Sequence, residues 1–297
     1  MTKPVPSGRS TVREAASGRS LTMLALSQLS RNKGAMLGLL MFIVVLLSAV
    51  FAKQLARYDP VSIRPQDYLQ PPTWKHLFGT DSFGRDVFSR TLYGGRISLR
   101  VGFLSVGVAA LIGSLLGLIA GYLGGLIDGA IMRFIDMLMA FPGVLLALGI
   151  VALLGRGMDN VIIAVGISAI PGYARLVRGC TLSAREELYV LAARSVGCRH
   201  RRILFRHVLP NILGPIIVLS TVDVAWAILN AASLSFLGLG AQPPTPEWGA
   251  MLSVGRGLLR EAPWQTVFPG LMIMMTVLSM NLLGDGLRDA LDPRVYG

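Results

Sequence analysis

The sequence predicts an all-α polytopic membrane protein with six transmembrane helices, on the evidence of its composition and of where its charges lie. Of its 297 residues, 53% are hydrophobic and 15% are charged, and the mean hydropathy is +0.61, which is too apolar for a soluble domain of this length. The formal net charge of +12 lies beside apolar runs. Positive charge that flanks spans is typical of integral membrane proteins, so we expect the lipid bilayer as its surroundings and no nucleic acid as partner.

Six apolar runs are the candidates for membrane spans. A bilayer core about 30 Å thick requires about 20 mostly apolar residues in one helix. The runs that meet or approach this length are residues 35–52, 98–121, 134–155, 159–177, 212–238 and 265–284. The third contains Pro142 and the fourth Pro171. Proline is tolerated in a membrane helix where neighbouring helices satisfy the freed carbonyl groups, so both runs remain predicted spans.

The basic residues between the runs predict the orientation of the chain. Residues 1–34 carry lysines and arginines and precede the first span, 35–52, so we expect a cytosolic N-terminal tail. A second group of arginines occupies a loop at residues 178–211, within a five-helix core of residues 98–290. Four spans separate it from the tail, so this loop is also expected in the cytosol, as is the C-terminus, residues 291–297.

The segment between the first two spans, residues 53–97, is an exception to the charge rule. The predicted orientation makes it external, although it contains Arg85, Arg90 and Arg96. Interleaved aspartates offset this charge only in part, because acidic residues contribute little to topology. We predict that residues 83–98 form an amphipathic helix at the membrane interface.

The second run carries glycines at every fourth position, namely Gly113, Gly117, Gly121 and Gly125. This spacing places them on one helix face. Packing drives helix association in lipid, and small residues on one face let another helix approach closely. We expect the partner helix to belong to the same chain, and a contact between subunits is the alternative.

The sequence contains none of the motifs that would make this chain an enzyme. A phosphate-binding P-loop requires a lysine followed by serine or threonine, and Lys3, Lys33, Lys53 and Lys75 are all followed by other residues. The 3 histidines lie outside the predicted spans and no HExxH motif occurs, which disfavours an intramembrane protease. We therefore expect no catalytic residue, metal site or cofactor in this chain, and another polypeptide would have to perform any ATP-driven work.

Asp223, Trp226 and Asn230 are the polar and aromatic residues that lie deepest in a predicted span. Their spacing places all three on one helix face. A carboxylate at membrane depth is costly and usually faces a polar cavity or a partner. The three residues therefore either line a pathway for a polar solute or surround a structural aspartate that is hydrogen-bonded within the chain.

The loop at 178–211 resembles the cytoplasmic EAA loop of bacterial ABC importer permeases. The family pattern Glu-Ala-Ala-x3-Gly-x9-Ile-x-Leu-Pro corresponds to Leu191-Ala192-Ala193, Gly197 and Leu209-Pro210 in this chain. Leu191 replaces the family glutamate, and His207 replaces the isoleucine. The resemblance implies two short coupling helices that dock on an ATPase, with a turn at Gly197 and an end to the second helix at Leu209-Pro210.

Further motifs are similar to the second, C-type permease of dipeptide and oligopeptide importers. They include Phe78-Gly79-Thr80-Asp81, residues 170–175 (IPGYAR) and residues 234–240 (LSFLGLG). The resemblance implies a type I ABC importer permease fold in the bacterial inner membrane. It also implies a heterodimer with a homologous permease, two ATPase subunits that bind ATP and Mg, and an external peptide-binding protein. The residues that it places at the ATPase contact are Glu187, Leu191, Ala192, Ala193, Gly197, Arg201, Leu209 and Pro210.

Two alternatives to peptide import remain open. Related permeases serve nickel chelates, glutathione or antimicrobial peptides, and the membrane subunit rarely discloses which. A secondary transporter that works without an ATPase is the alternative from a different class.

Overall fold

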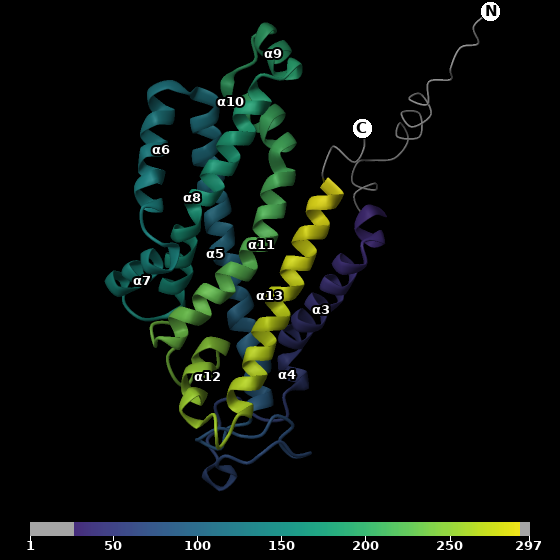
Figure 1. Cartoon of the computed structure of the whole chain (residues 1–297), viewed down its shortest axis with the longest axis vertical. Helices are drawn as coiled ribbons and strands as arrows, with labels where there is room; N and C mark the ends of the chain where they lie inside the picture. Colours follow the sequence, from purple (N-terminus) through teal and green to yellow (C-terminus); the bar gives the residue numbers. More distant parts are fainter. Residues whose placement is uncertain (1–26, 292–297) are drawn as a thin grey trace, which may run out of the picture.

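The computed structural model describes residues 27–291, which fold into a bundle of helices without strands (Figure 1). Residues 1–26 and 292–297 of the predicted terminal tails lie outside this described part. The long helices are α3 (Lys33–Val50), α5 (Val87–Leu123), α8 (Met158–Arg185), α11 (Leu209–Phe236) and α13 (Trp264–Leu291). The shorter helices are α4 (Ala52–Leu55), α6 (Gly125–Met139), α7 (Gly143–Leu154), α9 (Leu188–Ser195), α10 (His200–Ile203) and α12 (Trp248–Gly255), with 3-10 turns at Pro65–Asp67 and Arg256–Leu258 and a π-helical turn at Leu204–Val208.

The described residues agree with the predicted polytopic all-α fold, but one span is broken. Five helices are long and apolar enough to cross a membrane, and a sixth span exists only if α6 and α7 are taken together. These two helices are bent by 88° where they meet. Pro142, with φ −54° and ψ 132°, stands before α7. Proline disfavours the helical conformation of the residue before it, so the run predicted at 134–155 cannot be one straight helix.

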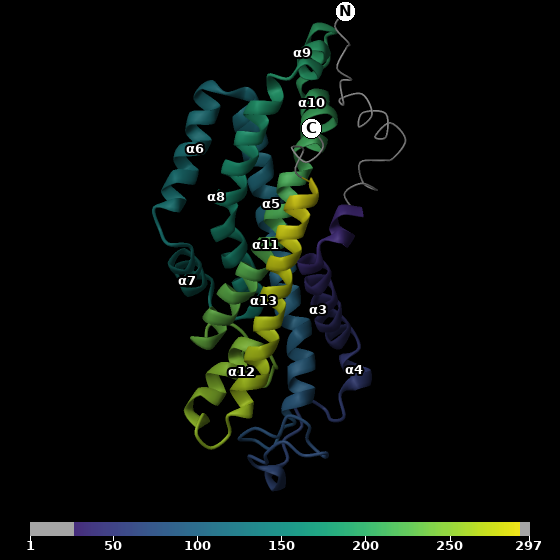
Figure 2. The same cartoon turned by 45° about the vertical axis from the view of Figure 1, so that its right-hand side comes forward.

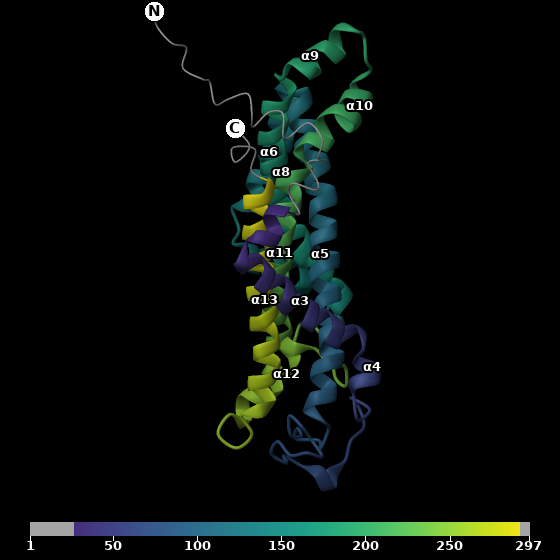
Figure 3. The ribbon, with the colours of Figure 1, turned by 90° about the vertical axis from the view of Figure 1, so that its right-hand side faces the viewer.

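The bundle carries irregular structure at both ends (Figures 1 and 2). At one end, uppermost in Figure 1, α9 and α10 extend beyond the other helices, and Figure 3 shows this from the side. At the opposite end lie α12 and the 57–86 segment, which we define as residues 57–86 between α4 and α5.

The helix predicted at residues 83–98 does not exist as a separate interfacial element. Helix α5 begins at Val87 and continues without interruption to Leu123, a length of about 55 Å at 1.5 Å per residue. Asp86 stabilises its beginning, because Asp86 Oδ2 accepts hydrogen bonds from Ser89 N at 2.8 Å and from Ser89 Oγ at 2.7 Å. The helix that contains the second predicted span therefore begins well before residue 98, and Arg90 and Arg96 are part of it.

The fourth-position glycines of α5 pack against α8 of the same chain. A Cβ atom on Gly113 would lie 2.7 Å from Ile170 O, and one on Gly121 would lie 2.8 Å from Arg178 O. Gly117 faces α8 between them. Gly125 differs, since it lies in α6 with φ +57° and has open space around it. The prediction of packing within one chain is therefore confirmed for the three glycines that lie in α5.

Helices α3 and α13 lie side by side in all three views (Figures 1–3). The beginning of α3 is capped by Asn32, whose Oδ1 accepts a hydrogen bond from Ala35 N at 3.1 Å. Along the contact, a Cβ atom on Gly38 would lie 2.9 Å from Ser279 O. The first span thus packs closely on the last one.

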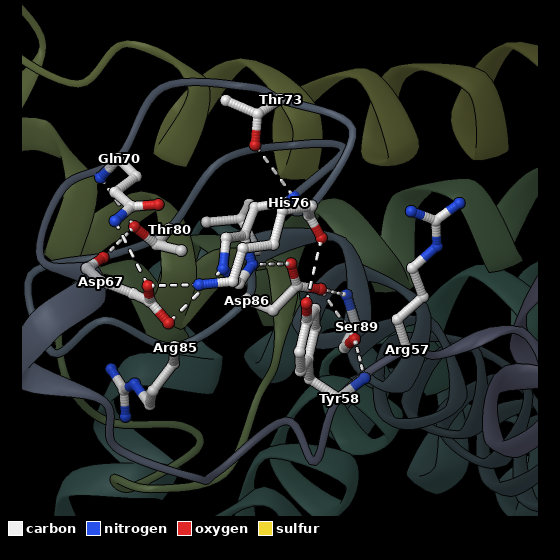
Figure 4. A network of polar contacts seen from close by, with 12 residues as sticks. Arg57, Tyr58, Asp67, Gln70, Thr73, His76, Thr80, Arg85, Asp86 and Ser89 are labelled. Atoms are coloured by element: carbon white, nitrogen blue, oxygen red, sulfur yellow. Dashed lines mark hydrogen bonds and ion pairs between the residues drawn. The ribbon is translucent and has the colours of Figure 1, made fainter.

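A buried polar network holds the 57–86 segment together (Figure 4). His76 is fully buried, and its Nδ1 lies 2.9 Å from Asp86 Oδ1. Lys75 Nζ lies 2.7 Å from Asp67 Oδ1, and this hydrogen bond holds the pKa of the Asp67 carboxyl below its usual value. Thr80 Oγ1 donates to Asp67 O at 2.5 Å. These contacts link distant parts of a segment that has little regular secondary structure, and His76 Nε2, 3.6 Å from Asp67 Oδ2, is the buried atom that they leave without a hydrogen bond.

Arg85, Arg90 and Arg96, which the predicted orientation places outside the cytosol, each have a partner within the chain. Arg85 Nε lies 2.7 Å from Asp81 Oδ2. Arg90 is buried and its Nη1 donates to Pro60 O at 2.7 Å. Arg96 Nε donates to Ala49 O at 2.6 Å, at the end of α3. These side chains therefore hold this end of the bundle together.

Candidate functional site

The 178–211 loop, with its exposed backbone turn, is the first candidate site. Helix α8 continues into it as far as Arg185, and α9 follows after Glu187, whose carbonyl accepts from Val190 N at 3.0 Å. Gly197 makes the turn after α9 with φ +76°, and no atom lies within 4 Å of where its Cβ would be. Glycine is therefore favoured at residue 197 for its backbone conformation and not for space.

The 178–211 loop exposes several large apolar side chains among its arginines. Leu188 is 82% exposed and Val196 is 81% exposed. Leu191 and Ala192 are also exposed, whereas Ala193 is buried. Exposed apolar side chains that cluster on one short element are typical of a protein interface. Of the residues expected at an ATPase contact, Glu187, Leu191, Ala192, Arg201 and Pro210 are accessible, and Ala193 lies inside.

The prediction that Leu209-Pro210 ends the second helix of the loop is wrong. Residues His200–Phe236 form one continuous helical rod of α10, the π-helical turn and α11. Pro210 lies at the beginning of α11, where the rod leaves the π-helical turn, and it removes one N–H from the helical ladder without ending the helix. The wider π-helical turn at Leu204–Val208 comes directly before it. The loop is consequently joined to α11 without a flexible break.

The second candidate site is a cavity between α5, α8 and α11. It has a volume of about 90 Å³, and Asp223, Trp226 and Asn230 all line it, together with Ser105 and Ser168. The prediction that these three residues share one helix face is therefore confirmed. Trp226 is also 59% exposed on the outside of the chain. A small polar cavity at the middle of the helices can hold water or a polar group of a solute.

A larger cavity lies between α8, α11 and α13, towards the 178–211 loop, and the sequence did not point to it. Its volume is about 570 Å³, and its lining includes Gly172, Leu176, Pro215, Asp285 and Arg288. A Cβ on Gly172 would meet nothing within 4 Å. The prolines and glycines of α8 and α11 were the available signal, since Pro171-Gly172 and Gly214-Pro215 lie inside two neighbouring helices beside this cavity.

Comparison with known protein families identifies the chain. Residues 113–296 match the model described as binding-protein-dependent transport system inner membrane component, which covers more than half of the chain. The chain belongs to this family. Residues 20–72 match a second model, the N-terminal transmembrane domain of oligopeptide transport permease C. The resemblance to C-type permeases of peptide importers is thereby confirmed, and the chain is a permease subunit of a binding-protein-dependent ABC transporter.

Its relatives include permeases named for two kinds of cargo. The dipeptide transport system permease protein DppC of Alkalihalophilus pseudofirmus is 50% identical over 271 residues, which cover 91% of this chain and 89% of that protein. The glutathione transport system permease protein GsiD of Escherichia coli is 52% identical over 268 residues, which cover 90% of this chain and 88% of that protein.

The fold is also found among solved structures. An inward-facing structure of the MetNI methionine ABC transporter matches with a TM-score of 0.56 at 17% identity, covering 68% of this chain and 96% of that chain. A second crystal form of the same transporter has a TM-score of 0.55. These matches confirm the predicted type I ABC importer permease fold.

Proposed function

We propose that this permease forms half of the translocation pathway of an ATP-driven importer of di- or oligopeptides. A homologous permease supplies the other half, two ATPase subunits dock on the 178–211 loop, and an external binding protein delivers the cargo at the opposite end. ATP and Mg bind to the ATPases and not to this chain. The N- and C-termini and the 178–211 loop lie in the cytosol of a bacterial cell, and the 57–86 segment lies outside.

The observation that carries this proposal is the continuous helix His200–Phe236. One end of this rod belongs to the exposed 178–211 loop, and its other half carries Asp223 and Asn230 into a polar cavity. An ATPase that moves the loop therefore moves a wall of the cavity. Closure of the ATPases on ATP shifts the permease pair to an outward-open state, and hydrolysis returns it to the inward-open state.

Peptide cargo is supported by the names of the relatives, among which dipeptide and glutathione permeases are about equally similar to this chain. Both cargoes are small peptides with charged termini. Glutathione is therefore the second candidate. Nickel chelates and antimicrobial peptides come after it, because neither of the relatives reported above is named for them.

The test is reconstitution of the complete transporter in proteoliposomes. This chain is co-expressed with its sister permease, both ATPases and the binding protein, and uptake of a radiolabelled dipeptide and of glutathione is measured with and without ATP. We expect uptake that requires both ATP and the binding protein. Uptake that survives without ATP and collapses with an uncoupler would instead indicate a secondary transporter.

A further inference from the structure

Gly121 and Tyr122, in the last turn of α5, contact three of the segments that form the 178–211 loop. Arg185 Nη1, at the end of α8, donates to Gly121 O at 3.0 Å. The Tyr122 hydroxyl lies 3.1 Å from Nδ1 of His200, the first residue of α10. The guanidinium of Arg194, in α9, lies over the Tyr122 ring at 5.2 Å from its centroid. One short stretch of α5 thus joins three separate parts of the loop.

Tyr122 is the residue at this junction that is built into the bundle. Its side chain is buried, with 6% of its surface exposed, whereas Arg194 and His200 lie on exposed elements. The His200 ring meets the Tyr122 ring edge to face, at 5.6 Å between centroids and an interplanar angle of 71°. The tyrosine therefore holds α9 through its ring face and α10 through its ring edge and hydroxyl.

Helix α5 extends from this junction to the polar cavity. Ser105 of α5 lines the cavity with Asp223, and its Oγ donates to Ile162 O of α8 at 3.1 Å. Along the helix Ser105 and Tyr122 are about 25 Å apart, at 1.5 Å per residue. A displacement of the loop can therefore reach the cavity through α5 as well as through α11, provided that the Tyr122 contacts persist.

We propose that Tyr122 is a positioning residue for energy coupling, which fixes both loop helices to α5 so that movement of the loop moves the cavity wall. This inference rests on the proposed function, because it requires an ATPase on the loop. Without the tyrosine, the ATPases would still bind and hydrolyse ATP. The loop would then move in some cycles without moving the cavity wall, so ATP would be hydrolysed without transport.

The experiment measures the ratio of peptide transported to ATP hydrolysed by the complete reconstituted transporter. We expect Tyr122→Ala to lower this ratio by about fivefold or more, the size of a typical coupling between sites. Tyr122→Phe keeps the ring and loses only the hydroxyl contact, so it should cause a smaller decrease. Leu123→Ala, at the neighbouring and half-exposed residue of the same turn, is the matched control and should leave the ratio unchanged.

A purely structural role predicts a different result. In that case Tyr122→Ala would reduce the amount of assembled complex, transport and hydrolysis would fall together, and the ratio would stay at the wild-type value, which would overturn the inference. If Tyr122→Ala fails to assemble, the same ratio is measured for Tyr122→Phe, for His200→Ala and for the double variant. Non-additive effects of these two substitutions on the ratio support the contact, and additive or absent effects overturn it.

The control for the proposed function itself is the wild-type complex. Wild-type uptake without any stimulation of ATP hydrolysis would reject the ATPase-driven mechanism and the inference with it. A wild-type complex with coupled uptake and a Tyr122→Ala variant with the same ratio would reject only the role of Tyr122.

Discussion

At the scale of single residues, backbone conformation and charge pairing decide what each position tolerates. Gly197 has open space where a Cβ would lie and is favoured for its positive φ, while Gly113, Gly117 and Gly121 of α5 have ordinary helical conformations and no space for a side chain. Asp67 and His76 are buried because they have polar partners, not because the segment around them is apolar. The same residue type therefore serves different purposes at different places.

Gly197→Val tests the turn after α9. A β-branched residue at φ +76° is strained by at least about 1–2 kcal/mol, so the turn should shift and displace the loop. We expect transport to fall while assembly with the sister permease is retained, as measured by uptake and by co-purification. Gly197→Asn, which tolerates this conformation, should restore most of the transport. Unchanged uptake in the valine variant would count against the role of the loop.

Asp67→Asn tests the polar network of the 57–86 segment. The folded-state pKa of Asp67 is lowered by Lys75, so the pair stabilises the fold above the unfolded pKa of about 3.9 and loses this contribution as the pH falls through the lower folded value. We expect the variant to have a lower Tm than the wild type at pH 7 and a smaller difference at pH 3. Asp59→Asn, at an exposed residue of the same segment, is the control. A Tm difference that does not depend on pH would contradict the ion pair.

At the scale of elements, close approach between helices and unbroken helical connections determine how movement can pass through the molecule. Helices α5 and α8 are in contact along the glycine face, and α10 and α11 are joined by a π-helical turn instead of a flexible loop. The α6–α7 pair is the opposite case, because it is broken at Pro142. The loop is therefore stiffly connected to α5, α8 and α11.

Gly113→Val tests the contact between α5 and α8. The new side chain would clash with Ile170 O and Tyr173, and overpacking of this kind typically costs about 1–3 kcal/mol. We expect a clear decrease in Tm in detergent. Gly107→Val, in the same helix with nothing within 4 Å, is the matched control and should change Tm little. Equal Tm values for both variants would show that the glycine face is not packed as described.

At the scale of the whole molecule, the chain separates two ends of different character. One end presents the apolar surface of α9, and the other presents a polar segment that is fixed to the bundle by Trp264 Nε1, which donates to Thr80 O at 2.9 Å. The helices that are long and apolar enough to cross a membrane lie between these two ends (Figure 1). The proposed orientation assigns the first end to the cytosol.

Cysteine labelling tests this orientation. Cys198 lies in the 178–211 loop, and Trp74, which is 89% exposed, lies in the 57–86 segment. The Trp74→Cys variant is made in a background without other cysteines. We expect a maleimide that cannot cross the inner membrane to label it in cells whose outer membrane has been permeabilised. Native Cys198, in a Cys180→Ala background, should be labelled only after the inner membrane is opened. Labelling of Cys198 while the inner membrane is intact would contradict the proposed cytosolic location of the 178–211 loop.

The sequence by itself determined the fold class, the approximate spans, the absence of a P-loop and the position of the 178–211 loop, because these depend on local hydropathy and on motif spacing. It also placed Asp223, Trp226 and Asn230 on one face, since helical periodicity alone fixes that relation. Only the tertiary structure decided the beginning of α5 at Val87, the continuity across Leu209-Pro210 and the junction at Tyr122. These features depend on partners far apart in the chain, such as Arg90 with Pro244 and Tyr122 with His200, and no local pattern encodes such contacts.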